Sequence, residues 1–497
     1  MTPRRATVAR TWVPLMAALL LQLVAAPAVA DLARAVNQAI SASGIPRSHI
    51  GVSVRDPRTG QELVDVAADT PRIPASNMKL ITTGAAITAF DLDHRFQTVL
   101  QLDGNRLIIV GGGDPALADP DLLAVMKDAD GNTLTVESLL DIWVTAIKQA
   151  GGTSITEIVV DDRIFDQDLV HPDWPVNQVE RHYSAEVSGL NFHRNIICLH
   201  PRSAGGHVIM GETPSAPFLP IHNELKNGSA SKTENVIDPH RQPGSDAITV
   251  RGSIIEPQVA PVEVTIHDPA LFTGRLLADR LGRQGMGQPP VRRARANETF
   301  SGQSLPFDVV TPLSTVSTEC NHESKNLYAE ALLKHIGHER SGQPGSWANG
   351  SAAMTDIVTE LTGTTGSGLV IADGSGWSQR NRISPALMTL WLCCFADRTP
   401  RGNAFRDSLP GPGEGTIGTR FNSRQLHGCT IQAKTGYITA VSALSGYVVA
   451  PDGRTYAFSI MGNTLKKIAP CKRLQEKIVQ AIAAELARRA PRARATN

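Results

Sequence analysis

The segment between residues 98 and 298 differs in pattern from the sequence on either side of it. It has few long helical patterns, and its short runs rich in Val and Ile are bounded by turn residues, as in Leu107 to Val110, Glu157 to Val160 and Ala247 to Val250. A chain of 497 residues is long enough for such a division, because single hydrophobic cores stop growing at about 250–300 residues. We therefore predict a β-rich insertion of two domains, which interrupts one domain formed by residues 31–97 and 299–490.

The two flanking parts carry patterns of both hairpins and helices. Alternating apolar residues predict one hairpin over His49 to Asp65 and another over Ser442 to Met461, each with a Pro/Asp/Gly turn. Apolar residues at helical spacing predict helices at Asn77 to Phe90, Asn326 to Ile336, Pro385 to Phe395 and Ala469 to Arg489. The interrupted domain is therefore expected to combine strands and helices.

Residues 1–30 have the features of a secretory signal peptide. Three arginines precede an apolar run from Val13 to Ala26, and Ala28-Val29-Ala30 is a small-x-small site, so we expect cleavage after Ala30. A retained membrane anchor is the weaker alternative, because the run is shorter than the ~20 residues that a spanning helix needs. The Arg-rich tail, residues 491–497, is expected to be disordered, with at most peripheral contact with a membrane.

The charge balance and the cysteines exclude several classes of function. A formal net charge of +1, from 48 basic and 47 acidic residues, gives no general attraction to nucleic acid. The six cysteines are not spaced like zinc ligands or a redox pair. We expect most of them to be buried apolar residues, although export to an oxidising compartment would permit one or two disulfides. The sequence has no His-Glu-x-x-His site, Gly-x-Ser-x-Gly elbow or phosphate-binding loop.

Ser76-Asn77-Met78-Lys79, at the start of a predicted helix, is a candidate nucleophile with its base. Positions three apart lie on one face of a helix, so the serine hydroxyl and the lysine amine would be neighbours. A serine needs an adjacent base, and a lysine can serve if burial and nearby positive charge lower its pKa. The pattern alone is weak, because Ser229-Ala230-Ser231-Lys232 also fits it and a lone Ser-x-x-Lys is usually an ordinary surface pair.

Two further motifs would complete such a site. In Ser324-Lys325-Asn326, just before a predicted helix, the serine would relay a proton and the asparagine would bind a substrate amide; helix capping is the alternative. In Lys434-Thr435-Gly436, before a predicted strand, the first two residues would hold a terminal carboxylate and the glycine would let the substrate approach closely. The strand edge would pair with an extended peptide. The alternative there is a strand end with an exposed lysine.

Taken together and in this order, the three motifs resemble the signature set of serine β-lactamases and penicillin-binding proteins. The long separation of Ser76 from Ser324 is similar to that of the class C low-molecular-mass penicillin-binding proteins, the D-alanyl-D-alanine carboxypeptidase/endopeptidase family (peptidase family S13), which fills it with additional domains. Further stretches resemble this family over nearly all of the mature chain: Gly111-Gly112-Gly113-Asp114-Pro115, Val160 to Phe165, Tyr183 to Asn195 and Asp373-Gly374-Ser375-Gly376.

The resemblance implies a fold, a reaction and its partners. The fold would be α+β: a transpeptidase-like domain with an antiparallel sheet flanked by helices, split by the large β-rich insertion. The reaction would be hydrolysis of peptidoglycan stem peptides in the periplasm, without metal or cofactor and with β-lactams as covalent inhibitors. Ser76 would attack the carbonyl and Lys79 would remove its proton, while Ser324 and Lys434 return a proton to the leaving amine. The backbone N–H groups of Ser76 and Tyr437 would form the oxyanion hole.

Two positions depart from the family pattern and bear on substrate preference. Tyr437 stands where the residue after Lys-Thr-Gly is commonly Ser or Thr, and it replaces a small hydroxyl by a bulky ring. Gln379 stands where relatives have an arginine that binds, with an acid from the insertion, the carboxylated side chain of diaminopimelate. Asp161 matches the position of that acid, and Arg380 lies one place after that of the arginine. We therefore expect weaker selection for a diaminopimelate side chain.

Two other functions stay open at this stage. A β-lactamase of this kind would need a dedicated deacylating water, and the long insertion argues against it. A catalytically impaired wall-binding or scaffold protein of the same fold is favoured by Tyr437 and Gln379. The presence of Ser76, Lys79 and the other motif residues argues against it, because a relic site would be free to lose some of them.

Overall fold

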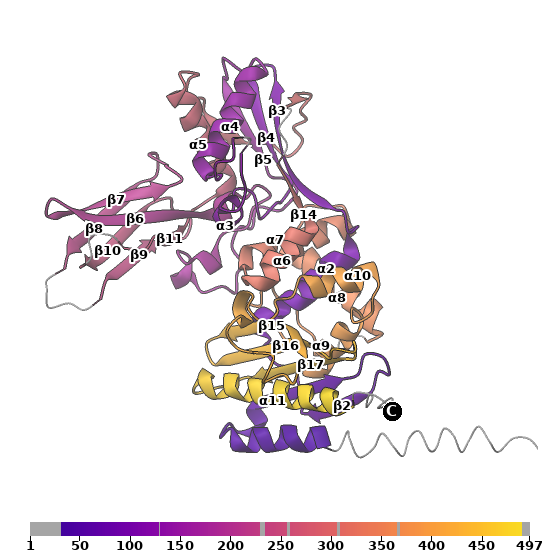
Figure 1. The fold of residues 1–497 in the computed structure, drawn as a ribbon. Coiled ribbons are helices and arrows are strands. Elements are labelled where there is room, and N and C mark those ends of the chain that lie inside the picture. Colours follow the sequence, from indigo (N-terminus) through magenta and orange to yellow (C-terminus); the bar gives the residue numbers. More distant parts are fainter. Residues whose placement is uncertain are drawn as a thin grey trace, which may run out of the picture.

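The computed structural model describes residues 31–128, 130–228, 234–255, 259–305, 309–364 and 368–489. The predicted signal peptide, the basic tail and the second Ser-x-x-Lys motif at Ser229 to Lys232 lie outside the described residues. Within those ranges, none of the helices combines the length and the apolar character needed to cross a bilayer. Figure 1 shows a lower body built from both ends of the chain and an upper region built from its middle.

An antiparallel sheet organises the lower body (Figure 1). Its strands lie in the order β15 (Thr430–Ile438), β16 (Val441–Val449), β17 (Thr455–Gly462), β1 (Ile50–Arg55) and β2 (Glu62–Val66). β1 pairs with β17 from Ile50 opposite Gly462 to Arg55 opposite Ala457, so segments from the two ends of the sequence are hydrogen-bonded neighbours. The β1–β2 and β16–β17 pairs confirm both predicted hairpins.

Helices cover both faces of this sheet because side chains alternate along each strand. On β16, Leu444 and Val448 join a hydrophobic cluster with α11 (Ile468–Arg488) and the helical residues 31–42. Ala443 and Tyr447 join a second cluster on the opposite face. The helices of that face are α2 (Met78–Ala89), α6 (Leu313–His322), α7 (Asn326–Ser341), α8 (Trp347–Thr362), α9 (Pro385–Cys393) and α10 (Pro400–Asp407). The sheet therefore lies between two helical layers, as the resemblance implied.

α2 and α9 are in close contact at one point. A Cβ on Gly84 would be 2.6 Å from Cζ2 of Trp391, so the two helices can approach this closely only without a side chain at that position. The buried indole N–H of Trp391 also donates to the carbonyl of Leu80 at 2.9 Å. Nearly all residues of α2 are buried, which suits a helix surrounded by protein.

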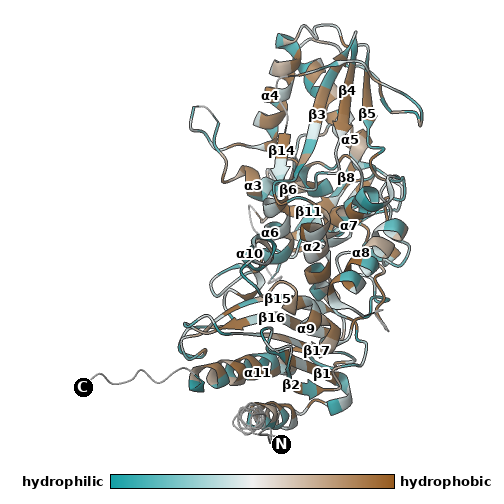
Figure 2. Ribbon diagram, turned by 90° about the vertical axis from the view of Figure 1, so that its right-hand side faces the viewer, coloured by the Kyte–Doolittle hydropathy of each residue, from teal (hydrophilic) through white to brown (hydrophobic). Residues whose placement is uncertain are grey.

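In the described residues, the insertion contains three sheets that share one hydrophobic cluster. The largest sheet contains the hydrophobic strands β4 and β5 (Figure 2). Its strands β3 and β14 run antiparallel to each other where the chain enters and leaves the lower body. Its members are β3 (Arg95–Asp103), β4 (Arg106–Gly111), β5 (Glu157–Asp161), β12 (Val291–Arg293), β13 (Gln303–Ser304) and β14 (Val309–Pro312). The second holds β8 (Ile221–Asn227), β9 (Val236–Arg241) and β10 (Ile248–Ile254), and the third β6 (Ile196–Ala204), β7 (His207–Thr213) and β11 (Val262–Thr265).

The insertion also contains helices that the sequence analysis did not identify. Besides the single turn α3 (Pro120–Leu123), the insertion contains α4 (Val136–Gln149) and α5 (Pro269–Arg283), and α5 packs on β5 and β12. α4 begins at a cap that is visible in the sequence, where Thr135 accepts a hydrogen bond from the backbone N–H of Ser138. α4 buries one stripe of mostly apolar residues, whereas α5 is buried except along a half-buried stripe that includes Leu271, Arg275 and Asp279.

All six cysteines are free, so the disulfides that export would permit are not formed in the structure. The burial expected for most of them is found at Cys320, Cys429 and Cys471, and the other three are half-buried. Burial raises the pKa of the Cys320 thiol to about 12, which keeps it neutral beside the amines described below.

Truncation of a buried α11 side chain tests the packing of this helix on the sheet. We expect Ile478→Ala to lower the free energy of unfolding by about 2–5 kcal/mol, because the side chain is fully buried and its loss leaves a cavity. Ile209→Ala removes the same atoms from a side chain that is 42% exposed, and should change that energy by no more than about 0.5 kcal/mol. Urea denaturation followed by circular dichroism compares the two variants; equal losses would contradict this arrangement.

Candidate active site

Ser76 lies one helical turn before Lys79, at the point where the 3-10 turn η2 (Ala75–Asn77) leads into α2. The Lys79 amine donates a hydrogen bond to Ser76 Oγ at 3.1 Å, as the spacing of the two residues predicted. Between them, the buried Asn77 side chain donates to Ser445 Oγ on β16 at 2.6 Å. This bond ties the turn that carries the serine to the central sheet.

Lys79 is fully buried and is held by acceptors from three segments. Besides Ser76, its Nζ donates to Asn326 Oδ1 on α7 at 2.7 Å and to the carbonyl of Ser375 at 3.0 Å. Burial lowers the pKa of Lys79 to about 8, although nearby acidic side chains oppose the shift. An amine with this pKa is neutral in an appreciable fraction of molecules near neutral pH, and it can then accept the proton of a serine hydroxyl.

Ser324 and Lys434 form a second hydroxyl–amine pair, in which Lys434 Nζ donates to Ser324 Oγ at 2.9 Å. Ser324 has a φ of 61°, in the left-handed region, and lies in the short connection between α6 and α7. Lys434 is fully buried, and burial, followed by the positive charge of Lys79, holds the pKa of Lys434 well below its usual value. The two amines are therefore close enough to influence each other's charge.

The Lys434-Thr435-Gly436 motif lies within β15 and not before a strand as expected. β15 is an edge strand of the sheet in the described part of the chain, and it packs beside η2. A Cβ on Gly436 would be 2.5 Å from the carbonyl oxygen of Pro74. The glycine is thus required for the strand to pack against the turn of Ser76, whereas the sequence had suggested the approach of a substrate. Thr435 Oγ1 hydrogen-bonds Thr416 Oγ1 at 2.9 Å.

A cleft of about 680 Å³ opens over these groups, and the insertion forms one of its walls. The Asn326 amide donates to the carbonyl of Tyr183 at 2.8 Å, and the Tyr183 ring packs on Trp377 with centroids 4.9 Å apart. Ser76, Ser324, Asn326 and Tyr437 all line the cleft, and the Tyr437 side chain is 61% exposed there. Residues of the first two motifs, and the residue that follows the third, therefore line one opening despite their distance along the chain.

Sequence reasoning missed the part of this wall formed by Asn177, Gln178, Arg181 and His182. These residues lie in and beside two short turns, η3 (Val176–Gln178) and η4 (His182–Ser184). No motif marks them. The available signal was the length of the connection between β5 and β6, because long connections with little regular structure are usually functional.

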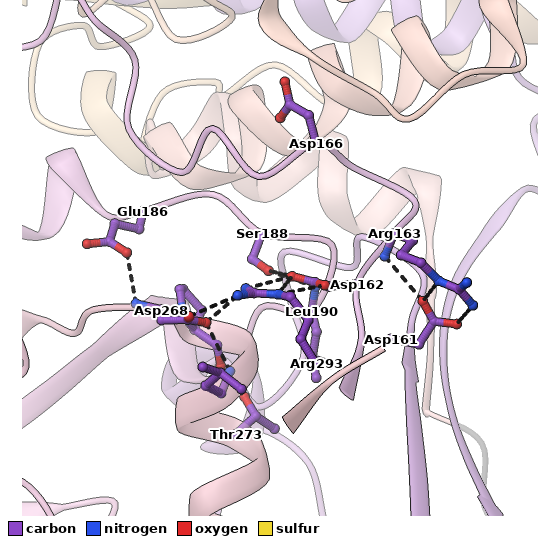
Figure 3. A network of polar contacts seen from close by, with 12 residues as sticks. Asp161, Asp162, Arg163, Asp166, Glu186, Ser188, Leu190, Asp268, Thr273 and Arg293 are labelled. Carbon is purple, nitrogen blue, oxygen red and sulfur yellow. Dashed lines mark hydrogen bonds and ion pairs between the residues drawn. The ribbon is translucent and has the colours of Figure 1, made fainter. Parts of the chain in front are cut away.

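Asp161 and Arg380, which were expected to bind a substrate side chain together, are not among the residues that line this cleft. The two carboxylate oxygens of Asp161 accept hydrogen bonds from Arg163, both at 2.7 Å (Figure 3). Arg380 donates to Asp173 at 3.2 Å, and its side chain is 75% exposed. Each charge is therefore paired with another residue of the chain, and the structure does not bring the two side chains together at the site.

Sequence comparison relates the chain to D-alanyl-D-alanine carboxypeptidases. The sequence model described as the D-Ala-D-Ala carboxypeptidase 3 (S13) family matches residues 32–485. A D-alanyl-D-alanine carboxypeptidase of Actinomadura sp. is 30% identical over 474 residues, which cover 89% of this chain and 82% of that protein. The D-alanyl-D-alanine carboxypeptidase DacB of Haemophilus influenzae is 22% identical over 448 residues, covering 83% of this chain and 84% of its own.

Solved structures show the same fold. The crystal structure of penicillin binding protein 4 from Haemophilus influenzae superposes with a TM-score of 0.72 at 20% identity, covering 92% of this chain and 99% of the other. The structure of that protein with a β-lactam gives a TM-score of 0.66 at 20% identity, with 88% and 96% covered. The family match extends over nearly all of the described residues. The chain therefore belongs to the D-Ala-D-Ala carboxypeptidase 3 (S13) family and is a class C low-molecular-mass penicillin-binding protein.

Proposed function

We propose that this enzyme is an exported serine D-alanyl-D-alanine carboxypeptidase/endopeptidase, in which Ser76 attacks the carbonyl between two D-alanines of a peptidoglycan stem peptide. The observation that carries the proposal is the contact between Ser76 Oγ, in the cleft, and the buried amine of Lys79. Family membership supports the substrate class. The signal peptide predicted for residues 1–30 supports export to the periplasm.

Acylation begins when neutral Lys79 takes the proton of Ser76 Oγ and the oxygen adds to the carbonyl carbon. The backbone N–H groups of Ser76 and Tyr437 bind the resulting oxyanion, and loss of one such donor would raise the barrier by about 2.7–4 kcal/mol. The C–N bond then breaks, and the proton taken by Lys79 reaches the leaving amine through Lys434 and Ser324 Oγ, which are in contact. Water hydrolyses the acyl-enzyme and restores the serine.

The edge strand β15 supplies the surface on which the substrate lies. One side of its backbone can pair with an extended peptide, while Lys434 and Thr435 hold the terminal carboxylate and Asn326 binds an amide group. β-Lactams would acylate the same serine and act as covalent inhibitors. Support for this comes from the Haemophilus influenzae penicillin binding protein 4, which has been solved with a β-lactam bound.

Labelling with a fluorescent penicillin tests the nucleophile and its base. The wild-type protein should be labelled stably, whereas Ser76→Ala lacks the nucleophile and Lys79→Ala lacks the base, so both should lose labelling. Lys477→Ala removes the same side chain from an exposed position on α11 and should be labelled like the wild type. Circular dichroism checks that all variants are folded. Labelling of the Lys79 variant at the wild-type rate would refute the role of the amine, and an unlabelled wild type would favour a binding module.

The rate of acylation should rise with pH through about 8, because burial lowers the pKa of Lys79 to that value and only the neutral amine can act as a base. Below this pH the Lys79 amine is mostly protonated, and above it mostly neutral, so the acylation rate should increase with pH and not decrease. Second-order rate constants for penicillin labelling, measured at a series of pH values, give the curve. A rate that stays flat or falls over this range is incompatible with Lys79 as the base.

Substrate selection should be independent of Arg380. Its side chain is bound to Asp173 outside the cleft, so Arg380→Ala should leave unchanged the ratio of hydrolysis rates for peptides with and without the diaminopimelate carboxylate. D-Alanine release from the two peptides gives the ratio for the variant and the wild type. If the variant loses a preference that the wild type shows, Arg380 reaches the substrate after all.

A further inference from the structure

Glu330 is a fully buried carboxylate on α7, one turn after Asn326, and sequence reasoning gave it no role. Its Oε2 accepts hydrogen bonds from the backbone N–H of Gly374 at 3.0 Å and from the indole N–H of Trp347 at 2.8 Å. Its Oε1 accepts one from the backbone N–H of Ser375 at 2.8 Å. A carboxylate accepts hydrogen bonds at both oxygens and so suits this set of three donors.

The segment that Glu330 holds is in direct contact with the base and with the turn of the nucleophile. The Ser375 carbonyl accepts the hydrogen bond of Lys79 at 3.0 Å, and the Gly374 carbonyl accepts one from Thr82 Oγ1 at 2.7 Å. At the next residue, a Cβ on Gly376 would lie 1.8 Å from the carbonyl oxygen of Ala75. A shift of this segment would therefore displace an acceptor of Lys79 and press on the backbone beside Ser76.

We propose that Glu330 is a positioning residue for acylation: its carboxylate fixes the backbone of Gly374 and Ser375, and with it the carbonyl that accepts the hydrogen bond of Lys79. This inference rests on the proposed function of Ser76 and Lys79. α7 then positions Lys79 in two ways. Asn326 Oδ1 accepts a hydrogen bond from Lys79 directly, and Glu330, one turn later, holds Ser375, whose carbonyl accepts another.

Glu330 also acts on Lys79 through its charge. Burial, with the nearby charge of Asp373, raises the pKa of Glu330 to about 7. When ionised, Glu330 favours the protonated form of Lys79 and so raises the pKa of Lys79. The other titratable groups that face this pair are Cys320, Lys334 and Lys434. Removal of the Glu330 charge should therefore make Lys79 neutral at lower pH.

The test compares Glu330→Gln with the wild type in the rate and pH dependence of labelling by a fluorescent penicillin. Glutamine has one acceptor oxygen, and its NH₂ group would face a backbone or indole N–H, so the loop should shift. We expect the acylation rate to fall by about 10²-fold, the cost that a small misplacement of reacting groups can have. The rise of the rate with pH should also move to lower pH. Glu330→Asp keeps the charge but shortens the side chain, so it should lower the rate and leave the pH dependence in place.

Trp347→Phe is the matched control. It removes one donor to Glu330 and leaves the carboxylate and both loop amides in place, so the acylation rate should fall far less than in Glu330→Gln. A Glu330→Gln variant with the rate and pH dependence of the wild type overturns the inference, and so does a lower rate with an unmoved pH dependence, which is what a merely structural role gives. A wild-type protein that penicillin does not label overturns the proposed function instead, so the two failures are distinguishable.

Discussion

Burial of the Lys79 amine is the constraint on which the active site depends. Removing an ammonium group from water is costly unless its N–H groups find acceptors and its pKa falls. The acceptors come from the turn of Ser76, from Asn326 on α7 and from the carbonyl of Ser375, three segments that are far apart in the sequence and meet only in the folded chain. In this serine carboxypeptidase, the completed fold therefore creates the base.

The insertion contributes to the same site from outside the transpeptidase-like domain. The Tyr183 carbonyl accepts a hydrogen bond from Asn326, and Asp119, at the start of α3, accepts bonds from Lys325 at 2.7 Å and from the Tyr328 hydroxyl at 2.5 Å. These three hydrogen bonds hold the residues next to Ser324, which has a left-handed conformation. The insertion is thus a structural part of the second motif as well as one wall of the cleft.

Local patterns were enough to predict the hairpins, several helices and the three motifs, because each depends on neighbours in sequence. That Ser76 and Lys434 lie in one site was predicted only through the family resemblance, since no periodicity encodes a contact between residues so far apart. The direction of the Arg380 side chain depends on its pairing with Asp173, which is remote in sequence. Gly436 is needed because of the carbonyl of Pro74, which is distant in sequence. The sequence could not show this contact, so the glycine was expected to make room for the substrate.

The two buried amines, Lys79 and Lys434, are close enough for the charge of Lys79 to act on Lys434. Burial lowers the pKa of each amine, and the positive charge of Lys79 lowers that of Lys434 further, so a proton on Lys79 disfavours a proton on Lys434. The neighbouring Cys320 thiol is neutral and compensates neither charge. In the proposed mechanism, the positive charge that Lys79 gains from Ser76 therefore weakens the binding of a proton at Lys434, whose Nζ donates to Ser324 Oγ. This favours passage of a proton from the Lys434–Ser324 pair to the leaving amine.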